Sequence, residues 1–188
     1  MNDELLQTKI RIPPVQSRVM DRPHLKSRLD DALKSRLVMV SAPAGFGKTT
    51  LLANWAAGAP NPPAWLSLDS DDNDSHVFWK YFVAALSGAY PGTGVSAMKT
   101  LQSPSGIPVK AVVKTLINEI FQKRETVSIV LDDFHLIESG SVLELFKFFI
   151  DYMPENVRLV ISTRTDLSFS AGRLRAEGQF DTITGEEL

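Results

Sequence analysis

Short apolar runs punctuate the chain, and longer stretches between them carry apolar residues every three or four positions. The runs cover residues 37–41, 64–68, 127–131, 157–163 and, less strongly, 180–184. Most of them are apolar at successive positions, which is typical of strands buried on both faces of a parallel sheet. This pattern predicts a parallel five-stranded sheet.

The stretches between the runs have the periodicity of helices that pack one face against a sheet. They predict helices at 21–33, 49–57, 76–90, 108–123, 141–153 and around 170–178, with 91–106 irregular or holding one short helix. Pro23 suits the first turn of the first helix, Gly58 the end of the second, and Asp74 or Ser75 the start of the third. The alternation predicts an α/β fold with helices on both faces of the sheet.

The two ends of the chain differ from its middle. Residues 1–20 are polar and interrupted by Pro13 and Pro14, so we expect an extended segment in front of one domain that spans 21–188. The last residues, GEEL, read as the first turn of another helix, so we expect a longer polypeptide to continue beyond them.

Composition narrows the possible chemistry. The 188 residues include no cysteine, which excludes disulfides, thiolate zinc sites and cysteine nucleophiles. The net charge of −2 argues against a strong electrostatic grip on nucleic acid. Without a signal peptide or a run of membrane-spanning length, we expect a cytoplasmic protein with no membrane partner. His24, His76 and His135 lack metal-ligand spacing, so we expect them at the surface or at helix ends.

A loop of small residues, APAGFGKTT, joins the first apolar run to the second helix. It matches the phosphate-binding loop pattern, except that Ala42 stands at the first glycine position. Small residues let backbone N–H groups wrap phosphates, Gly45 and Gly47 can adopt a positive φ, and the helix directs its N-terminal dipole at the anion. The nucleotide-binding residues predicted here are Ala44, Gly45, Phe46, Gly47, Lys48, Thr49 and Thr50.

Three of these side chains have separate roles in that hypothesis. Lys48 reaches the β- and γ-phosphates, the Thr49 hydroxyl ligates Mg²⁺, and Thr50 contacts the α-phosphate. The alternative interpretation is a glycine turn followed by a solvated lysine.

Acidic and basic residues follow two later strands. In the segment SIVLDD, an apolar run is followed directly by Asp132 and Asp133. Ligands bind at the carboxyl ends of parallel strands, which is where these two residues are expected. We expect Asp132 to hold Mg²⁺ and Asp133 to orient or deprotonate an attacking water. Arg164, after the run LVIST, can stabilise charge on the γ-phosphate. The alternatives are aspartates that cap the next helix and an ordinary surface arginine.

Four segments together resemble a known family. They are TKIRIPP…SRVMDRPHLKSRL, LVMVSAPAGFGKTTLLANWA, PAWLSLDSDDND and IVLDDFHLI…LVISTRTDL…LRAEGQ. In this order they resemble the N-terminal ATPase domain of the large ATP-binding LuxR-type transcriptional regulators related to the bacterial maltose-regulon activator, of the STAND class of P-loop ATPases. The resemblance covers essentially the whole chain.

The resemblance implies a P-loop NTPase fold with strand order 5-1-4-3-2 and an ATP/ADP switch that regulates transcription. It places Val19 and Arg22 at the adenine end of the nucleotide, with the segment 1–20 packed on the site. It further implies slow hydrolysis that resets the switch, self-association when ATP and an inducer are bound, and DNA binding only through a C-terminal helix-turn-helix domain. A P-loop kinase or transferase and an AAA+-like motor ATPase are the alternatives.

Overall fold

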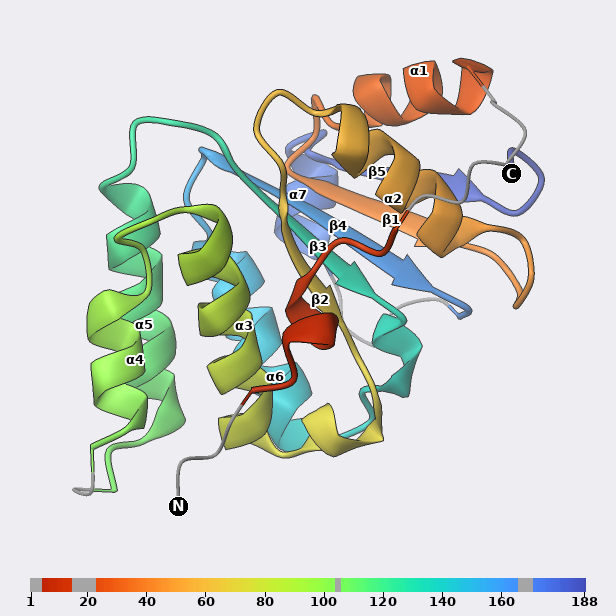
Figure 1. The fold of residues 1–188 in the computed structure, drawn as a ribbon. Helices are drawn as coiled ribbons and strands as arrows, with labels where there is room; N and C mark the ends of the chain where they lie inside the picture. Colours follow the sequence, from red (N-terminus) through yellow and green to blue (C-terminus); the bar gives the residue numbers. More distant parts are fainter. Residues whose placement is uncertain (1–4, 15–22, 104–105, 166–170) are drawn as a thin grey trace.

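The computed structural model describes residues 5–14, 23–103, 106–165 and 171–188. Within them, one parallel sheet is built from β1 (Leu37–Ser41), β2 (Ala64–Ser67), β3 (Val127–Asp132), β4 (Val157–Thr163) and β5 (Phe180–Thr184). Its order is β2-β3-β4-β1-β5, so the predicted order 5-1-4-3-2 is confirmed when the sheet is counted from its other edge. This order sets β4 between β1 and β3, and all the carboxyl ends meet at one edge (Figure 1).

Helices cover both faces of the sheet, as predicted. They are α1 (Pro23–Ala32), α2 (Lys48–Gly58), α3 (Ser75–Ala89), α4 (Val95–Leu101), α5 (Val109–Phe121), α6 (Gly140–Tyr152) and α7 (Gly172–Ala176), with single 3-10 turns η1 (Gln7–Ile10), η2 (Ser70–Asn73) and η3 (Phe134–Leu136). Figure 1 shows α1 and α2 on one face and α3 to α6 on the other. Asp74 caps α3, since its carboxylate accepts from the N–H groups of His76 and Val77.

The two helical layers explain why the strands are apolar at successive positions. Val130 packs in a cluster with Leu29 of α1 and Trp55 of α2, whereas its neighbour Leu131 joins a second cluster with Phe78 and Phe146. Successive strand side chains point to opposite faces, and both faces are covered here. The core thus holds the strand ends rigidly at the carboxyl edge.

Long-range ion pairs fix both ends of the described chain to the sheet layers. Near the N-terminus, Lys9 Nζ lies 2.7 Å from Asp72 and 3.0 Å from Asp69, and Asp72 is fully buried. Near the C-terminus, Arg28 of α1 lies 2.8 Å both from Asp181 of β5 and from Glu187. Residues 185–187 form a turn, and the ion pair between Arg28 and Glu187 connects this turn to α1.

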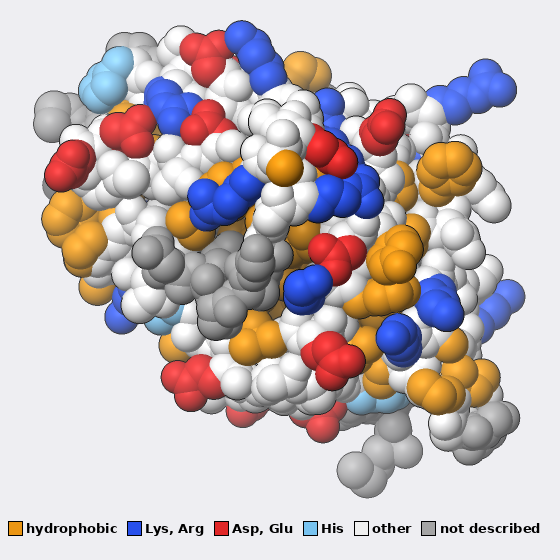
Figure 2. Space-filling model, turned by 180° about the vertical axis from the view of Figure 1, so that it is seen from behind, with side chains coloured by type: hydrophobic (Ala, Val, Ile, Leu, Met, Phe, Trp, Pro, Cys, Tyr) orange, Lys and Arg blue, Asp and Glu red, His pale blue; other side chains and the backbone are white. Residues whose placement is uncertain are grey.

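The surface carries both signs of charge. Figure 2 shows the face opposite to the view of Figure 1, where Lys and Arg side chains are interspersed with Asp and Glu. In the described ranges, no helix combines the length and the apolar character needed to cross a bilayer.

Candidate functional site

The loop between β1 and α2 has the backbone geometry of an anion cradle. Gly45 and Gly47 have φ values of +84° and +81°, a region that side chains other than glycine rarely adopt. A Cβ on either glycine would meet nothing within 4 Å, so the conformation and not crowding requires glycine here. Because α2 begins at Lys48, its free N–H groups face the loop. The loop can therefore wrap an anion.

Lys48 directs its charge into this loop. Its Nζ donates to the carbonyl oxygens of Ala42 and Pro43, at 2.7 and 3.1 Å, and the residue is 6 % exposed. Burial lowers the pKa of Lys48, while the nearby carboxylates of Asp133 and Asp132 raise it and Arg164 lowers it. The ammonium group has only neutral carbonyl partners, so it can exchange them for a phosphate oxygen.

The next residue, Thr49, is joined to the end of β3. Its hydroxyl donates to Asp132 Oδ2 at 2.8 Å, across 83 positions of sequence. Asp132 is 3 % exposed; burial raises its pKa, and hydrogen bonds from Ser162 and Thr49 lower it. A hydroxyl beside a carboxylate is a pair of hard oxygen ligands that can hold Mg²⁺. No group of three or more acidic, cysteine or histidine side chains in the described ranges forms a metal cage, so further ligands would come from a bound group and water.

Ser162 organises the two aspartates and was missed by the sequence analysis. Its hydroxyl donates to Asp132 Oδ1 and accepts from the backbone N–H of Asp133 at 2.9 Å. Asp133 has φ +58°, the one positive value at a non-glycine among the described residues. The signal in the sequence was a serine inside an otherwise apolar strand, which is a polar group that must find a buried partner.

His135 was expected at the surface or in a capping role, and the structure places it half-buried in the short turn η3. Its side chain is 12 % exposed, and its Nδ1 lies 3.7 Å from Asp133 Oδ1. Burial lowers the pKa of His135; the charge of Asp133 raises it, and those of Arg164 and Lys48 lower it. The histidine thus stands among the charged groups of the site.

The other predicted residues lie around the same edge. Arg164 follows the last residue of β4 and is exposed, close enough to act on the pKa of Lys48 and His135. Phe46 is 46 % exposed at the loop tip, Ala44 is exposed and Thr50 is half-buried in α2. The two residues predicted at the adenine end, Val19 and Arg22, lie outside the described residues.

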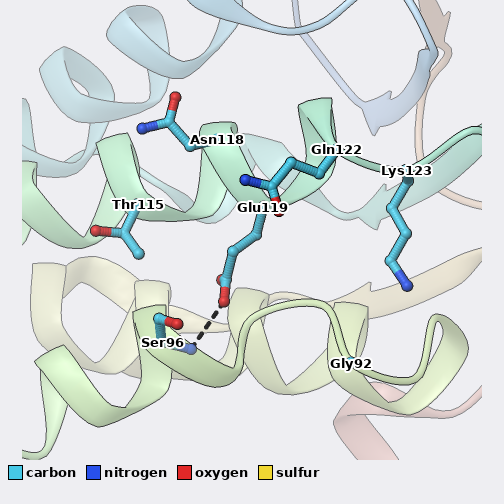
Figure 3. Close-up of a pocket in the computed structure, with 7 residues that line it drawn as sticks. All are labelled: Gly92, Ser96, Thr115, Asn118, Glu119, Gln122 and Lys123. Atoms are coloured by element: carbon cyan, nitrogen blue, oxygen red, sulfur yellow. Dashed lines mark hydrogen bonds between the residues drawn. The ribbon is translucent and has the colours of Figure 1, made fainter.

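A separate polar cavity lies between α4 and α5, on the other side of the molecule from the loop (Figures 1 and 3). It measures about 550 Å³. Glu119 accepts from the N–H of Ser96 at 2.8 Å, and Lys123 Nζ donates to the carbonyl of Pro91 at 2.8 Å. Its charged side chains hold two helices and the turn before them together, which is a structural role.

Comparison with known proteins relates the chain to a group of regulators. No protein-family model matches it. It is 30 % identical to the HTH-type transcriptional regulator MalT of Klebsiella pneumoniae and 34 % identical to MalT of Yersinia pestis. Each match covers 184 residues, 98 % of this chain and 20 % of the relative, so the chain spans a fifth of the length of these relatives.

Solved structures agree on the fold. Cdc6p from Pyrobaculum aerophilum superposes with a TM-score of 0.60 at 13 % identity, over 95 % of this chain and 49 % of that one. The Orc1 protein of Aeropyrum pernix, solved in complex with DNA, gives 0.51 at 17 % identity, over 92 % and 46 %. The chain therefore has a P-loop ATPase fold and is homologous to one part of the HTH-type transcriptional regulators MalT.

Proposed function

We propose that the chain is the nucleotide-binding switch domain of a signal-responsive transcriptional activator. It binds ATP or ADP with Mg²⁺, and slow ATP hydrolysis resets the switch. The names of the relatives and the P-loop fold support this proposal at the level of class. The observation that carries it is the hydrogen bond of 2.8 Å between Thr49 and Asp132, which joins the glycine loop to the acidic strand end.

Each part of the site has a task in this proposal. Backbone N–H groups of the loop bind phosphate oxygens, and Lys48 leaves the carbonyls of Ala42 and Pro43 for the β- and γ-phosphates. Thr50 contacts the α-phosphate. Thr49 and Asp132 would hold Mg²⁺, which when bound neutralises charge on the phosphate oxygens.

Two residues act on the reaction itself. Asp133 orients the attacking water or accepts its proton, and Arg164 stabilises charge that develops on the transferred phosphoryl group. Asp133 directly follows β3 and Arg164 directly follows β4, so both stand at the carboxyl edge of the sheet.

The remaining assignments concern parts beyond this site. We assign the adenine end to Val19 and Arg22, in a segment 1–20 that packs on the nucleotide domain 21–188. In the longer protein, self-association would follow the binding of ATP and an inducer, and a C-terminal helix-turn-helix domain would bind DNA. A cytoplasmic location fits such a regulator.

Calorimetric titration with Mg·ADP and with a slowly hydrolysed ATP analogue tests the nucleotide site. Lys48→Ala removes the side-chain cation aimed at the β- and γ-phosphates, so affinity should fall at least tenfold, about 1.4 kcal/mol. Lys34→Ala is the matched control, since Lys34 is 79 % exposed and pairs only with Asp31 among the described residues. Equal affinities for wild type and Lys48→Ala, with both folded by circular dichroism, would remove the loop from the site.

A further inference from the structure

Asn73 is a residue to which the proposed function gives no task, yet its side-chain amide is fully engaged in hydrogen bonds. Its N–H groups donate to the carbonyl oxygens of Ser70 at 3.1 Å and Leu136 at 2.8 Å. Its oxygen accepts from the backbone N–H groups of Glu138 at 2.7 Å and Ser139 at 2.8 Å. An asparagine side chain has two N–H donors and an oxygen with two lone pairs, so each of them has a partner here.

These hydrogen bonds join the segments that leave two neighbouring strands. Asn73 is the last residue of η2, which follows β2, whereas residues 136–139 follow β3 and lead into α6. Since β2 and β3 are paired in parallel, both segments start at the carboxyl edge of the sheet (Figure 1). Asn73 therefore clamps the turn after β3 to the turn after β2.

The turn η2 is a firm support for this clamp, because its own side chains are anchored in the domain. Asp72 is fully buried, and its Oδ2 accepts from Lys9 Nζ at 2.7 Å and from the N–H of Asp69 at 2.8 Å. The carboxylate of Asp74, the next residue after Asn73, caps α3. A movement of η2 would break a buried ion pair, so the position of Asn73 is set by the domain and not by the loop that it holds.

The turn that Asn73 holds begins at Asp133, whose backbone has φ +58° and ψ +41°. A residue other than glycine persists in this left-handed region where its surroundings enforce it. Both backbone polar groups of Asp133 are bonded: its N–H donates to Ser162 of β4, and its carbonyl oxygen accepts from the N–H of Leu136 at 3.1 Å. Since Asn73 in turn holds the carbonyl of Leu136, the backbone of Asp133 is fixed between β4 and η2.

We propose that Asn73 is a positioning residue for Asp133. It holds the left-handed turn after β3, so that the carboxylate leaves the strand end in the direction of the attacking water. Without the clamp, the backbone of Asp133 can relax to ordinary φ values, and a displacement of about 1 Å in a catalytic group can cost about a hundredfold in rate. This inference rests on the proposed function, because that function gives Asp133 the role of orienting or deprotonating water.

Asn156 provides a matched control for this role. Its amide also joins chain segments, because it donates to backbone carbonyl oxygens at 3.2, 3.1 and 3.1 Å, those of Ile120, Lys123 and Glu125. These contacts lie before β3 and β4 begin, at the opposite edge of the sheet from Asp133. Replacement of either asparagine by alanine removes hydrogen bonds of the same kind, so both variants should have a lower Tm than wild type. Only Asn73→Ala should impair hydrolysis.

Single-turnover ATP hydrolysis and Mg·ADP titration separate positioning from stability. We expect Mg·ADP affinity within about twofold of wild type in both alanine variants, because neither asparagine touches the phosphate loop. Hydrolysis should fall at least about tenfold in Asn73→Ala and stay within about threefold in Asn156→Ala. Asn73→Asp keeps an acceptor for Glu138 and Ser139 but has no N–H for Leu136, so it should be as slow as Asn73→Ala although more stable. A smaller loss in Asn73→Ala, an equal loss in Asn156→Ala, or full activity in Asn73→Asp would overturn the proposal.

Amide hydrogen exchange provides a readout that needs neither nucleotide nor turnover. In Asn73→Ala, the amide of Asp133 should exchange at least about tenfold faster relative to the amides of residues 128–131, because its bond to Ser162 opens when the turn relaxes. In Asn156→Ala this ratio should equal that of wild type. An unchanged ratio in Asn73→Ala would contradict the clamp. A wild type that binds no nucleotide would instead contradict the proposed function, whatever the exchange rates.

Discussion

At the scale of single residues, the hydroxyl of Ser162 controls both aspartates at the end of β3. It donates to the carboxylate of Asp132 and accepts from the N–H of Asp133, while Thr49 holds the other oxygen of Asp132. The buried carboxylate is thus stabilised as an anion from two sides, against the desolvation that raises its pKa. Asp132 is fixed, whereas the carboxylate of Asp133 remains adjustable.

This difference separates metal binding from hydrolysis. Asp133→Asn should keep the fold within about 0.5 kcal/mol, because asparagine tolerates the positive φ and retains the N–H that bonds Ser162. Mg·nucleotide affinity should change little, since Asp132 carries the metal in our proposal. Hydrolysis should be abolished. Single-turnover assays of both proteins measure this, and a variant as active as wild type would take Asp133 out of the mechanism.

The wild-type rate itself should be low. The side chain of Asp133 is one methylene shorter than that of a glutamate placed at the same position. Its carboxylate therefore extends less far from the strand end toward an attacking water. We expect on the order of one turnover per minute or slower, against a typical enzyme rate of about 10 s⁻¹. Turnover near that typical rate would favour a motor ATPase or another enzyme over a switch.

The sequence predicted only some of these residues. Lys48, Thr49 and Asp132 stand in motifs whose chemistry is local, and the structure brings them together. The places of Ser162 and His135 in the site were not predicted, because they depend on contacts that the motifs do not encode; the one signal was the serine inside an apolar strand. The register of β4 beside β3 places Ser162 next to the two aspartates. The turn at Asp133, with its positive φ, places His135.

At the scale of elements, Arg28 joins α1 to the last strand. Its guanidinium binds both oxygens of Asp181 at 2.8 and 3.0 Å, Glu187 at 2.8 Å and the carbonyl of Thr182 at 2.9 Å. These contacts bring the residues after β5 next to the glycine loop, where a Cβ on Gly185 would lie 3.3 Å from that of Ala42. The end of the described chain is therefore packed against the site.

Loss of this cluster should destabilise the domain. The groups are about one-third exposed, so we expect Arg28→Ala to cost about 1 kcal/mol, a fall in Tm of about 2–4 °C. Lys34→Ala, which breaks an exposed pair near the end of the same helix, should change Tm much less. Differential scanning calorimetry compares the two variants, and equal shifts would show that Arg28 has no special role.

The effect of Arg28 should also depend on pH. The hydrogen bonds from Arg28 lower the pKa of Asp181, and that of Glu187 is lowered first by the Thr184 N–H and then by Arg28. A carboxyl group with a lowered pKa in the folded state contributes stability above its unfolded pKa, about 4, and loses it as the pH falls through the folded value. The difference between wild type and Arg28→Ala should be constant between pH 6 and 8 and shrink below about pH 4. A difference that grows toward acid pH would have the wrong sign.

Regular elements were predictable because apolar periodicity reflects burial on two faces. The strand order was also predicted, although from the resemblance and not from periodicity. The contacts of Lys9 with Asp72 and of Arg28 with Asp181 were not predicted, since they join polar residues 63 and 153 positions apart. Nothing local distinguishes such residues from solvated ones.

At the scale of the whole molecule, charge and size bear on DNA binding. The net charge is −2, and acidic side chains interrupt the basic ones on the face shown in Figure 2. A protein that binds the phosphate backbone of DNA needs a basic surface. Sequence-specific recognition also needs an element that contacts the base edges. The Orc1 structure contains DNA, but at 17 % identity that likeness concerns the fold alone. The relatives are about five times longer than this chain, which leaves room for a separate DNA-binding part.

We therefore expect this chain to show no sequence-specific DNA binding. Any DNA binding should be weak, equal for unrelated DNA sequences, and lost as the salt concentration rises, because it would come only from phosphate contacts. Fluorescence anisotropy with a pool of genomic fragments, at 50 and 200 mM salt and with or without Mg·ATP, measures this. A longer protein that carries the proposed helix-turn-helix domain is the matched comparison, and it should select particular fragments from the same pool. Nanomolar, sequence-selective binding by the 188 residues alone would contradict our proposal that DNA reading belongs to another part of the protein.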